Sequence, residues 1–200
     1  MPIQQMLLGA GGSKQSNGFI DELFAPNTYL GTGTSSSSTQ NIYNGVGTEA
    51  GGMVWIKERN SNNSSVIYDT SRGGTKYLRS NTDAGQTTAS GSMGSGLTFL
   101  SNGFRVHGDD GAQNQSSGNK YSAWSFKENK HFFAICSWTG NGAGSRQISH
   151  SLESVPGCIM IKRTDDSYGW YVYHRGLDSS NPERYYLRLN ETDASQNTTG

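Results

Sequence analysis

The sequence GMVWIKER at residues 52–59 recurs as GCIMIKR at residues 157–163. The sequence YLRSNTDA at residues 77–84 recurs in the same order as YLRLNETDA at residues 186–194. The members of each pair lie about 105 to 109 positions apart, so the repeating unit has about a hundred residues. Solenoid and propeller repeats have periods of roughly 20–50 residues, which is too short for this spacing. The pattern therefore indicates a small domain that was duplicated.

The repeated segments have the composition of β-strands. Residues 53–56 and 158–161 are apolar at every position, which is typical of central strands covered on both faces. Residues 66–68 and 171–173 are rich in the β-branched and aromatic residues that suit a pleated surface. Both copies are therefore expected to contain the same pair of strands.

Further strands are expected at residues 97–99 and 104–106, on either side of the Asn102-Gly103 turn signal, and at residues 121–126 and 132–136. No stretch of a dozen residues keeps a helical period. Short strands at this density predict an all-β protein of tandem β-sandwich domains, concanavalin-like or jelly-roll-like. A β-barrel would have the same sequence pattern.

The repeat also predicts the domain boundaries. Residues 1–27 form a leader that belongs to neither copy, residues 28–131 form the first sandwich, and residues 132–200 form the second. The second copy stops before its hairpin and last two strands, which would leave sheet edges and a core face open to water. We therefore expect the natural chain to continue beyond Gly200.

The leader contains two apolar clusters separated by a Gly/Ser-rich stretch. Two interpretations are open, a frayed terminus or a docking peptide that needs a partner to bury its apolar side chains. In the second interpretation, glycines let the backbone approach the partner closely. The candidate docking residues are Met6, Leu7, Leu8, Gly9, Gly11, Gly12, Phe19, Ile20, Leu23 and Phe24.

The overall composition argues against several classes of function. Sixteen basic and sixteen acidic residues give a net charge of zero, so we expect no nucleic-acid partner. No apolar run approaches the roughly 20 residues of a membrane span, and the N-terminus lacks the basic start of a signal peptide. Cys136 and Cys158 are the two cysteines; they are interpreted as buried reduced side chains, with a disulfide as the alternative. No metal or cofactor is expected.

Catalytic motifs are also missing from the sequence. Asp109-Asp110 and Asp165-Asp166 are adjacent pairs in Gly/Ser/Asn-rich segments, where such residues usually make turns, although a loop calcium site is an alternative. No nucleophile elbow or phosphate-binding loop is present, so an enzyme is not expected. Trp170 has no aromatic counterpart in the first unit and is the candidate for an exposed sugar contact, against a framework role.

Several phrases resemble structural proteins of marine bacteriophages, especially phages of cyanobacteria. The resemblance covers nearly the whole chain, and the phrases are QQMLLGAGG at residues 4–12, GGMVWIK at 51–57, YLRSNTDA at 77–84, WTGNG at 138–142, VPGCIMIKR at 155–163 and WYVYHR at 170–175. Such proteins are tail fibres or related appendages, in which concanavalin-like sandwiches follow an N-terminal attachment segment. The family has no catalytic motif to transfer to this chain.

The resemblance implies a homotrimeric fibre that assembles in the host cytoplasm and is located on the tail of the virion. Residues 1–27 would attach it to a tail protein, and distal parts would contact a glycan or protein of the host surface. Two alternatives stay open: a capsid decoration or capsid fibre protein, and a tailspike that depolymerises host glycan. The resemblance names neither the host nor the receptor.

Overall fold

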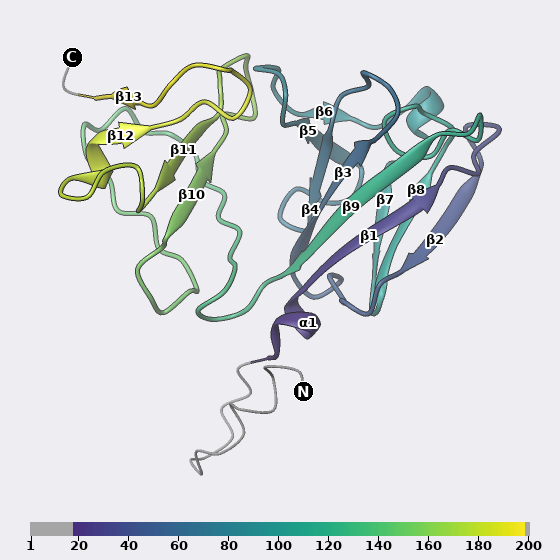
Figure 1. Cartoon of the computed structure of the whole chain (residues 1–200), viewed down its shortest axis with the longest axis horizontal. Coiled ribbons are helices and arrows are strands. Elements are labelled where there is room, and N and C mark those ends of the chain that lie inside the picture. The colour runs from purple at the N-terminus through teal and green to yellow at the C-terminus, as the bar shows by residue number, and fades with distance from the viewer. Residues whose placement is uncertain (1–17, 199–200) are drawn as a thin grey trace, which may run out of the picture.

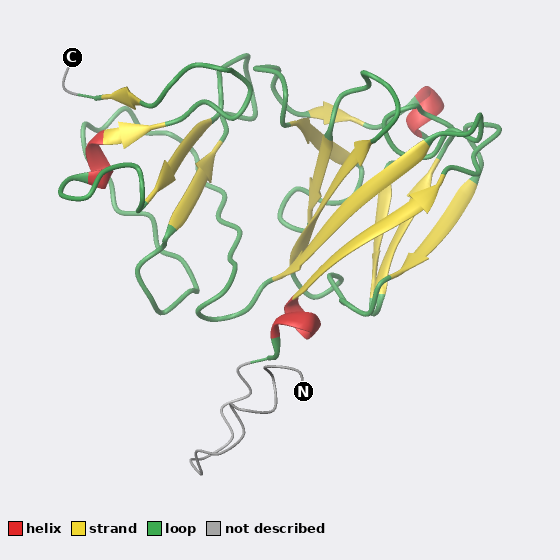
Figure 2. Ribbon diagram, viewed as in Figure 1, coloured by secondary structure: helices red, strands yellow, loops and turns green. Residues whose placement is uncertain are grey.

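The computed structural model describes residues 18–198, which form an almost entirely β structure (Figures 1 and 2). This confirms the predicted all-β class. The helices are short: α1 (Ile20–Leu23) and two 3₁₀ helices, Gly91–Met93 and Pro182–Arg184. The strands are β1 (Phe24–Leu30), β2 (Thr39–Tyr43), β3 (Gly52–Glu58), β4 (Val66–Asp69), β5 (Lys76–Arg79), β6 (Thr87–Thr88), β7 (Leu97–Leu100), β8 (Gly103–His107), β9 (Lys120–Lys127), β10 (Cys158–Ile161), β11 (Tyr171–His174), β12 (Tyr185–Tyr186) and β13 (Gln196–Asn197).

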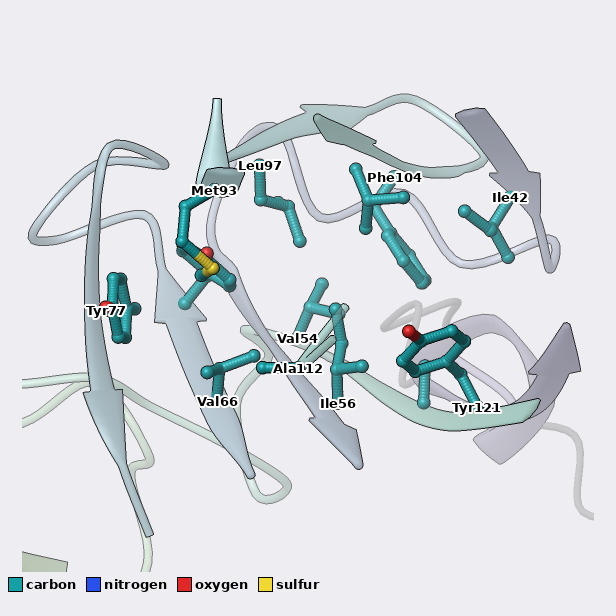
Figure 3. Close-up of a cluster of buried hydrophobic side chains, with 13 residues drawn as sticks. Ile42, Val54, Ile56, Val66, Tyr77, Met93, Leu97, Phe104, Ala112 and Tyr121 are labelled. Atoms are coloured by element: carbon teal, nitrogen blue, oxygen red, sulfur yellow. The ribbon is translucent and has the colours of Figure 1, made fainter. Parts of the chain in front are cut away.

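The first unit consists of two antiparallel sheets. The larger has the strand order β1-β9-β3-β4-β5-β6 and the smaller has the order β2-β8-β7. Side chains from both sheets meet in one buried core, with Ile42 and Phe104 from the smaller sheet and Ile56, Val66 and Tyr121 from the larger (Figure 3). The predicted hairpin is confirmed, because β7 and β8 pair directly across a tight turn.

A loop at one end of this core is held by buried amides. The Gln113 side chain donates to the carbonyl oxygens of His107 (2.6 Å) and Met93 (3.2 Å), and its own oxygen accepts from the Tyr68 hydroxyl (2.7 Å). The neighbouring Asn114 donates to the carbonyl of Gly108. Both amides are fully buried, so each needs these partners to offset its lost hydration.

The outer face of the larger sheet is also apolar. Side chains alternate between the two faces along each strand, so apolar residues next to core residues in β3, β4 and β5 lie on this outer face. Met53, Ile67 and Leu78 lie on this face and pack against Trp170, which comes from the second unit. β3 is therefore covered on both sides, as its unbroken apolar sequence predicts. The second unit supplies one of the two covers (Figure 1).

The duplicated strands recur with the same register. In the first unit, β3 and β4 place Met53 opposite Asp69, Val54 opposite Tyr68, Trp55 opposite Ile67 and Ile56 opposite Val66. In the second unit, β10 and β11 place Cys158 opposite His174, Ile159 opposite Tyr173, Met160 opposite Val172 and Ile161 opposite Tyr171. Each residue of the second set lies 105 positions after its counterpart. The repeat in the sequence is therefore a repeat of strand pairing.

The correspondence continues through the next two strands. Ile67 faces Leu78 as Val172 faces Leu187, and Tyr77 faces Thr87 as Tyr186 faces Gln196. Three hydrogen bonds donated by backbone N–H groups recur as well. In the first unit they run from Thr70 to Gly52, from Ser65 to Asn81 and from Ala89 to Thr75. Their equivalents in the second unit run from Arg175 to Gly157, from Trp170 to Asn190 and from Thr198 to Arg184. The β3–β6 sheet of the first unit thus has a counterpart in β10–β13.

Two sequence predictions differ from the structure. β10 is exposed at all four residues, whereas the sequence predicts a strand covered on both faces. Residues 132–136 contain only an isolated bridge at Phe133 and no strand. The described residues of the second unit contain no counterparts of β7, β8 and β9, which agrees with the incomplete second copy that the sequence predicts. Without the strand that would pair with it, an apolar sequence alone does not produce burial or a ladder.

The start of the first unit also lies earlier than predicted. β1 begins at Phe24 and pairs with β9 along its whole length, so residues 24–27 belong to the sheet and not to the leader. Pro26 resembles a strand breaker in the sequence. It is tolerated because β1 is an edge strand, where a missing N–H need not cost a ladder hydrogen bond.

Candidate docking surface

The point where the leader joins the first unit is held by one turn of helix. The N–H of Glu22 donates to the Phe19 carbonyl (2.9 Å), and the Glu22 carboxylate accepts from the Phe19 N–H (3.3 Å). This turn directs Leu23 into the protein, where it is 6% exposed, and leads directly into β1. The connection between leader and sandwich therefore has a defined geometry (Figure 1).

Phe19 and Ile20 remain on the surface of this turn, with exposed fractions of 47% and 54%. Beside them is a shallow depression lined by Gly18, Ile20, Leu23 and residues 129–132. Its rim carries Lys130, which is paired with Glu153 (2.5 Å). An exposed apolar pair next to a depression is the type of surface that a partner protein covers.

The candidate docking residues fall into three groups. Phe19 and Ile20 are exposed and available. Leu23 and Phe24 are not, because Leu23 is buried and the Phe24 ring packs on Phe126 at 4.8 Å between ring centres; their predicted docking role is corrected to a role in folding. The remaining candidates lie outside the described residues: Met6, Leu7, Leu8, Gly9, Gly11 and Gly12.

Trp170 is not an exposed sugar contact. It is 5% exposed, packs against Met53, Ile67 and Leu78, and donates its indole N–H to the carbonyl of Arg79 (3.0 Å). Of the two interpretations of Trp170, the framework role agrees with the structure, because the other unit covers its ring, a contact that a comparison of the two copies does not reveal. Trp170 is the anchor between the units.

A second shallow depression lies on the edge of the larger sheet. It is lined by Trp124 and Ser122 of β9 and by residues 26–28 of β1. Trp124 stands opposite Trp55, with their rings edge-to-face at 6.0 Å. The sequence analysis did not single out this surface. The alternating pattern of residues 121–126 could have predicted it, because it places Trp124 on the sheet face opposite to the core residues Tyr121 and Ala123.

The acidic pairs lie in loops, as their contexts predict, and the second pair also forms ion pairs that the sequence analysis did not predict. The Asp110 carboxylate accepts from the Ala112 N–H and the Ser92 hydroxyl, each at 2.8 Å. Arg163 pairs with Asp165 and Asp166, and the hydrogen bond from Arg163 lowers the pKa of the Asp165 carboxyl. Within residues 18–198, no three His, Cys, Asp or Glu side chains are grouped closely enough to hold a metal ion.

The cysteines are free, and the structure corrects the prediction that both are buried. Cys158 is exposed on β10, and Cys136 is half-buried near the start of the second unit. Glu58 is a buried carboxylate of the first unit, and it accepts hydrogen bonds from Asn119 (2.7 Å), Asn63 (2.5 Å) and Ser61. Its partners are neutral amides and a hydroxyl that fix the neighbouring loop. None of the helices in the described part of the chain is long and apolar enough to cross a membrane.

Residues 21–200 match the model of a protein family described as a domain of unknown function, DUF7483. The match therefore includes both units and the single turn of α1 from Asp21 onward. No curated protein and no solved structure matches the chain.

Proposed function

We propose that this chain, which belongs to the DUF7483 family, is a structural protein of a bacteriophage virion and the base of a tail fibre. The observation that carries the proposal is the recurrence of the β3–β6 sheet as β10–β13 in the same register. A fibre must extend outward from the particle, and repeated modules joined by buried side chains achieve this with one type of contact. In this role the protein is a scaffold and not an enzyme.

The anchor would be the leader together with Phe19 and Ile20. These two side chains are exposed on the turn of helix that leads directly into β1. The partner would be a tail protein that covers both side chains and the depression beside them. The fibre would be a homotrimer on the virion tail, since parallel chains around one axis give a closed assembly. Distal parts would contact the host.

The test is incorporation into particles. We expect a chain without residues 1–17, and separately a Phe19→Asp, Ile20→Asp double variant, to fold normally and to be lost from purified virions. Val155→Asp is the matched control, because Val155 is 84% exposed and does not line the depression beside Ile20. Full incorporation of both docking variants would refute the anchor.

The alternatives are distinguished on the intact particle. Cryo-electron microscopy of particles that carry a labelled chain should place it at the tail. Density on the capsid shell would instead make it a decoration or capsid fibre protein. Shortening of host polysaccharide by the purified chain would contradict the scaffold role and favour a depolymerase.

A further inference from the structure

The outer face of the smaller sheet carries a row of polar side chains. Ile42 of β2 and Phe104 and Val106 of β8 point into the core, so the residues that alternate with them point outward. The polar outward residues are Thr39, Asn41 and Tyr43 on β2, Arg105 and His107 on β8, and Thr98 on β7. The larger sheet lies between this face and the second unit, so the second unit leaves it open (Figure 1).

Three of these side chains hold one another in place. Asn41 lies opposite Arg105 in the ladder between β2 and β8. The Nε of Arg105 donates to Oδ1 of Asn41 (2.6 Å), and Nδ2 of Asn41 donates to the hydroxyl oxygen of Tyr43 (2.6 Å). A guanidinium group only donates, so the amide must turn its oxygen to Arg105 and its nitrogen to Tyr43. Arg105 and Tyr43 are therefore oriented before any ligand arrives.

The groups that this arrangement leaves over are donors. Within residues 18–198, the two terminal nitrogens of Arg105 have no protein acceptor. The hydroxyl oxygen of Tyr43 accepts from Asn41, so its hydrogen is left to donate outward. A ligand on this face must therefore supply acceptor oxygens. Two terminal nitrogens of one arginine match the two oxygens of a carboxylate through parallel hydrogen bonds.

The charge of the face also favours an anion. β2, β7 and β8 contain no Asp or Glu, so no carboxylate on these strands neutralises Arg105. His107 lies opposite Thr39 and shares a hydrogen bond with the Thr98 hydroxyl (2.8 Å). Burial, and after it the like charge of Arg105, lowers the pKa of His107. A negative charge bound beside Arg105 would act on this histidine in the opposite direction.

The ring of Tyr43 narrows the class of ligand. It is 61% exposed, although its hydroxyl is tied to Asn41, so it presents a fixed apolar surface beside the donors. A sugar acid carries a carboxylate and an apolar C–H face on one rigid ring, whereas an acidic peptide side chain would leave Tyr43 uncovered. We propose that this face binds an acidic saccharide, whose carboxylate pairs with Arg105 and whose ring lies on Tyr43.

The test is a titration of the full chain, followed by NMR at the ring signals of His107. Methyl glucuronide should shift these signals saturably and raise the pKa of His107 by at least about 0.5. Methyl glucoside and acetate, at the same ionic strength, should each bind at least about tenfold more weakly. Arg105→Gln and Tyr43→Ala should each weaken glucuronide binding at least about tenfold. Arg59→Gln is the matched control, because it removes the same charge at an exposed site after β3 of the larger sheet, and it should bind as the wild type does.

Several results would overturn the proposal. Equal binding of acetate would reduce the face to a site for small anions, and equal binding of the glucoside would show that the charge is not used. Tighter binding of a tetraglutamate peptide would assign the face to an acidic polypeptide. A chain that is dimeric by light scattering, and monomeric as Arg105→Gln, would make it an interface between copies. Incorporation into particles plays no part in these measurements, so the proposed fibre role can fail without affecting the result.

Discussion

Trp170 is the residue on which the contact between the two units depends. Its ring fills a site formed by Met53, Ile67 and Leu78, and its indole N–H satisfies the carbonyl of Arg79. We expect Trp170→Ala to lower the free energy of unfolding by about 3–5 kcal/mol, because it removes a large buried ring and leaves a cavity. Urea unfolding followed by circular dichroism measures this change.

Two further variants separate the causes. Trp170→Phe keeps most of the apolar contact but removes the hydrogen bond, so a loss of about 1–3 kcal/mol is expected. Tyr168→Ala, at a side chain that is 52% exposed, should change stability by less than about 0.5 kcal/mol. If Trp170→Ala were as mild as Tyr168→Ala, the units would not be joined at this site.

Tyr121 makes stability depend on alkaline pH. It is fully buried, and burial raises the pKa of its hydroxyl to about 12. An unfolded tyrosine has a pKa near 10, so the stabilising effect is complete below about pH 10 and is lost as pH rises towards 12. We expect the free energy of unfolding to fall by about 1–3 kcal/mol over this range. Burial also raises the pKa of Tyr29 and Tyr68, which act in the same direction.

The check compares thermal melts at pH 8, 10 and 11 in the wild type and in Tyr121→Phe. The variant should be less stable at pH 8, because it loses the hydrogen bonds to the Gly111 carbonyl and from the Gln115 N–H, both 3.0 Å. Its melting temperature should nevertheless fall less between pH 10 and 11. An identical pH dependence would exclude Tyr121 as a source.

At the scale of elements, the turn that follows β8 requires glycine. Gly108 has φ of +79°, and a Cβ there would collide with the backbone of Ser92. Gly118 has a similar φ of +83° but open space around it. We expect Gly118→Ala to cost about 1–2 kcal/mol of backbone strain and Gly108→Ala clearly more, enough to reduce the yield of folded protein. Denaturation midpoints of the two variants measure the difference, and equal midpoints would show that the collision relaxes freely.

The elements also show how far the sequence could predict this fold. The pairing of β3 with β4 follows from their apolar and β-branched residues, and the same signal correctly places β10 and β11. The burial of a strand does not follow from its own composition, because it depends on which other strands pack against it. β10 has the composition of a covered strand and lacks the cover, and residues 132–136 have strand composition without a partner.

The candidate docking site was predictable only in part. Phe19 and Ile20 were identified from an apolar cluster and are exposed as expected. Phe24 was assigned to the same cluster, but its partner Phe126 is about a hundred residues away, and local sequence contains no sign of this contact. The sugar-contact interpretation of Trp170 fails for the same reason. Long-range packing decides whether an aromatic side chain is a contact for a partner or part of the core.

At the scale of the whole molecule, the two units share the same four-strand arrangement, but its faces are buried in the first unit and exposed in the second. The larger sheet of the first unit lies between the smaller sheet and the second unit, so both of its faces are protected. The corresponding sheet of the second unit has exposed residues on both faces, Ile159 and Ile161 on one and Met160 on the other. Among the described residues, the sheet of the first unit is therefore the better covered of the two.

The position of β1 gives a final prediction about truncation. Removing residues 1–27 deletes Leu23 and Ala25 from the buried set and Phe24 from its contact with Phe126. Loss of a buried Leu or Phe side chain costs about 1.5–3 kcal/mol, so this truncation should lower the free energy of unfolding by several kcal/mol. Removing residues 1–17 should leave the melting temperature within about 2 °C, because it deletes none of the described buried apolar side chains, which begin at Leu23. Calorimetry of both chains decides the matter. Equal destabilisation by the two truncations would mean that the leader contributes to folding, and loss of particle incorporation could then not be attributed to docking alone.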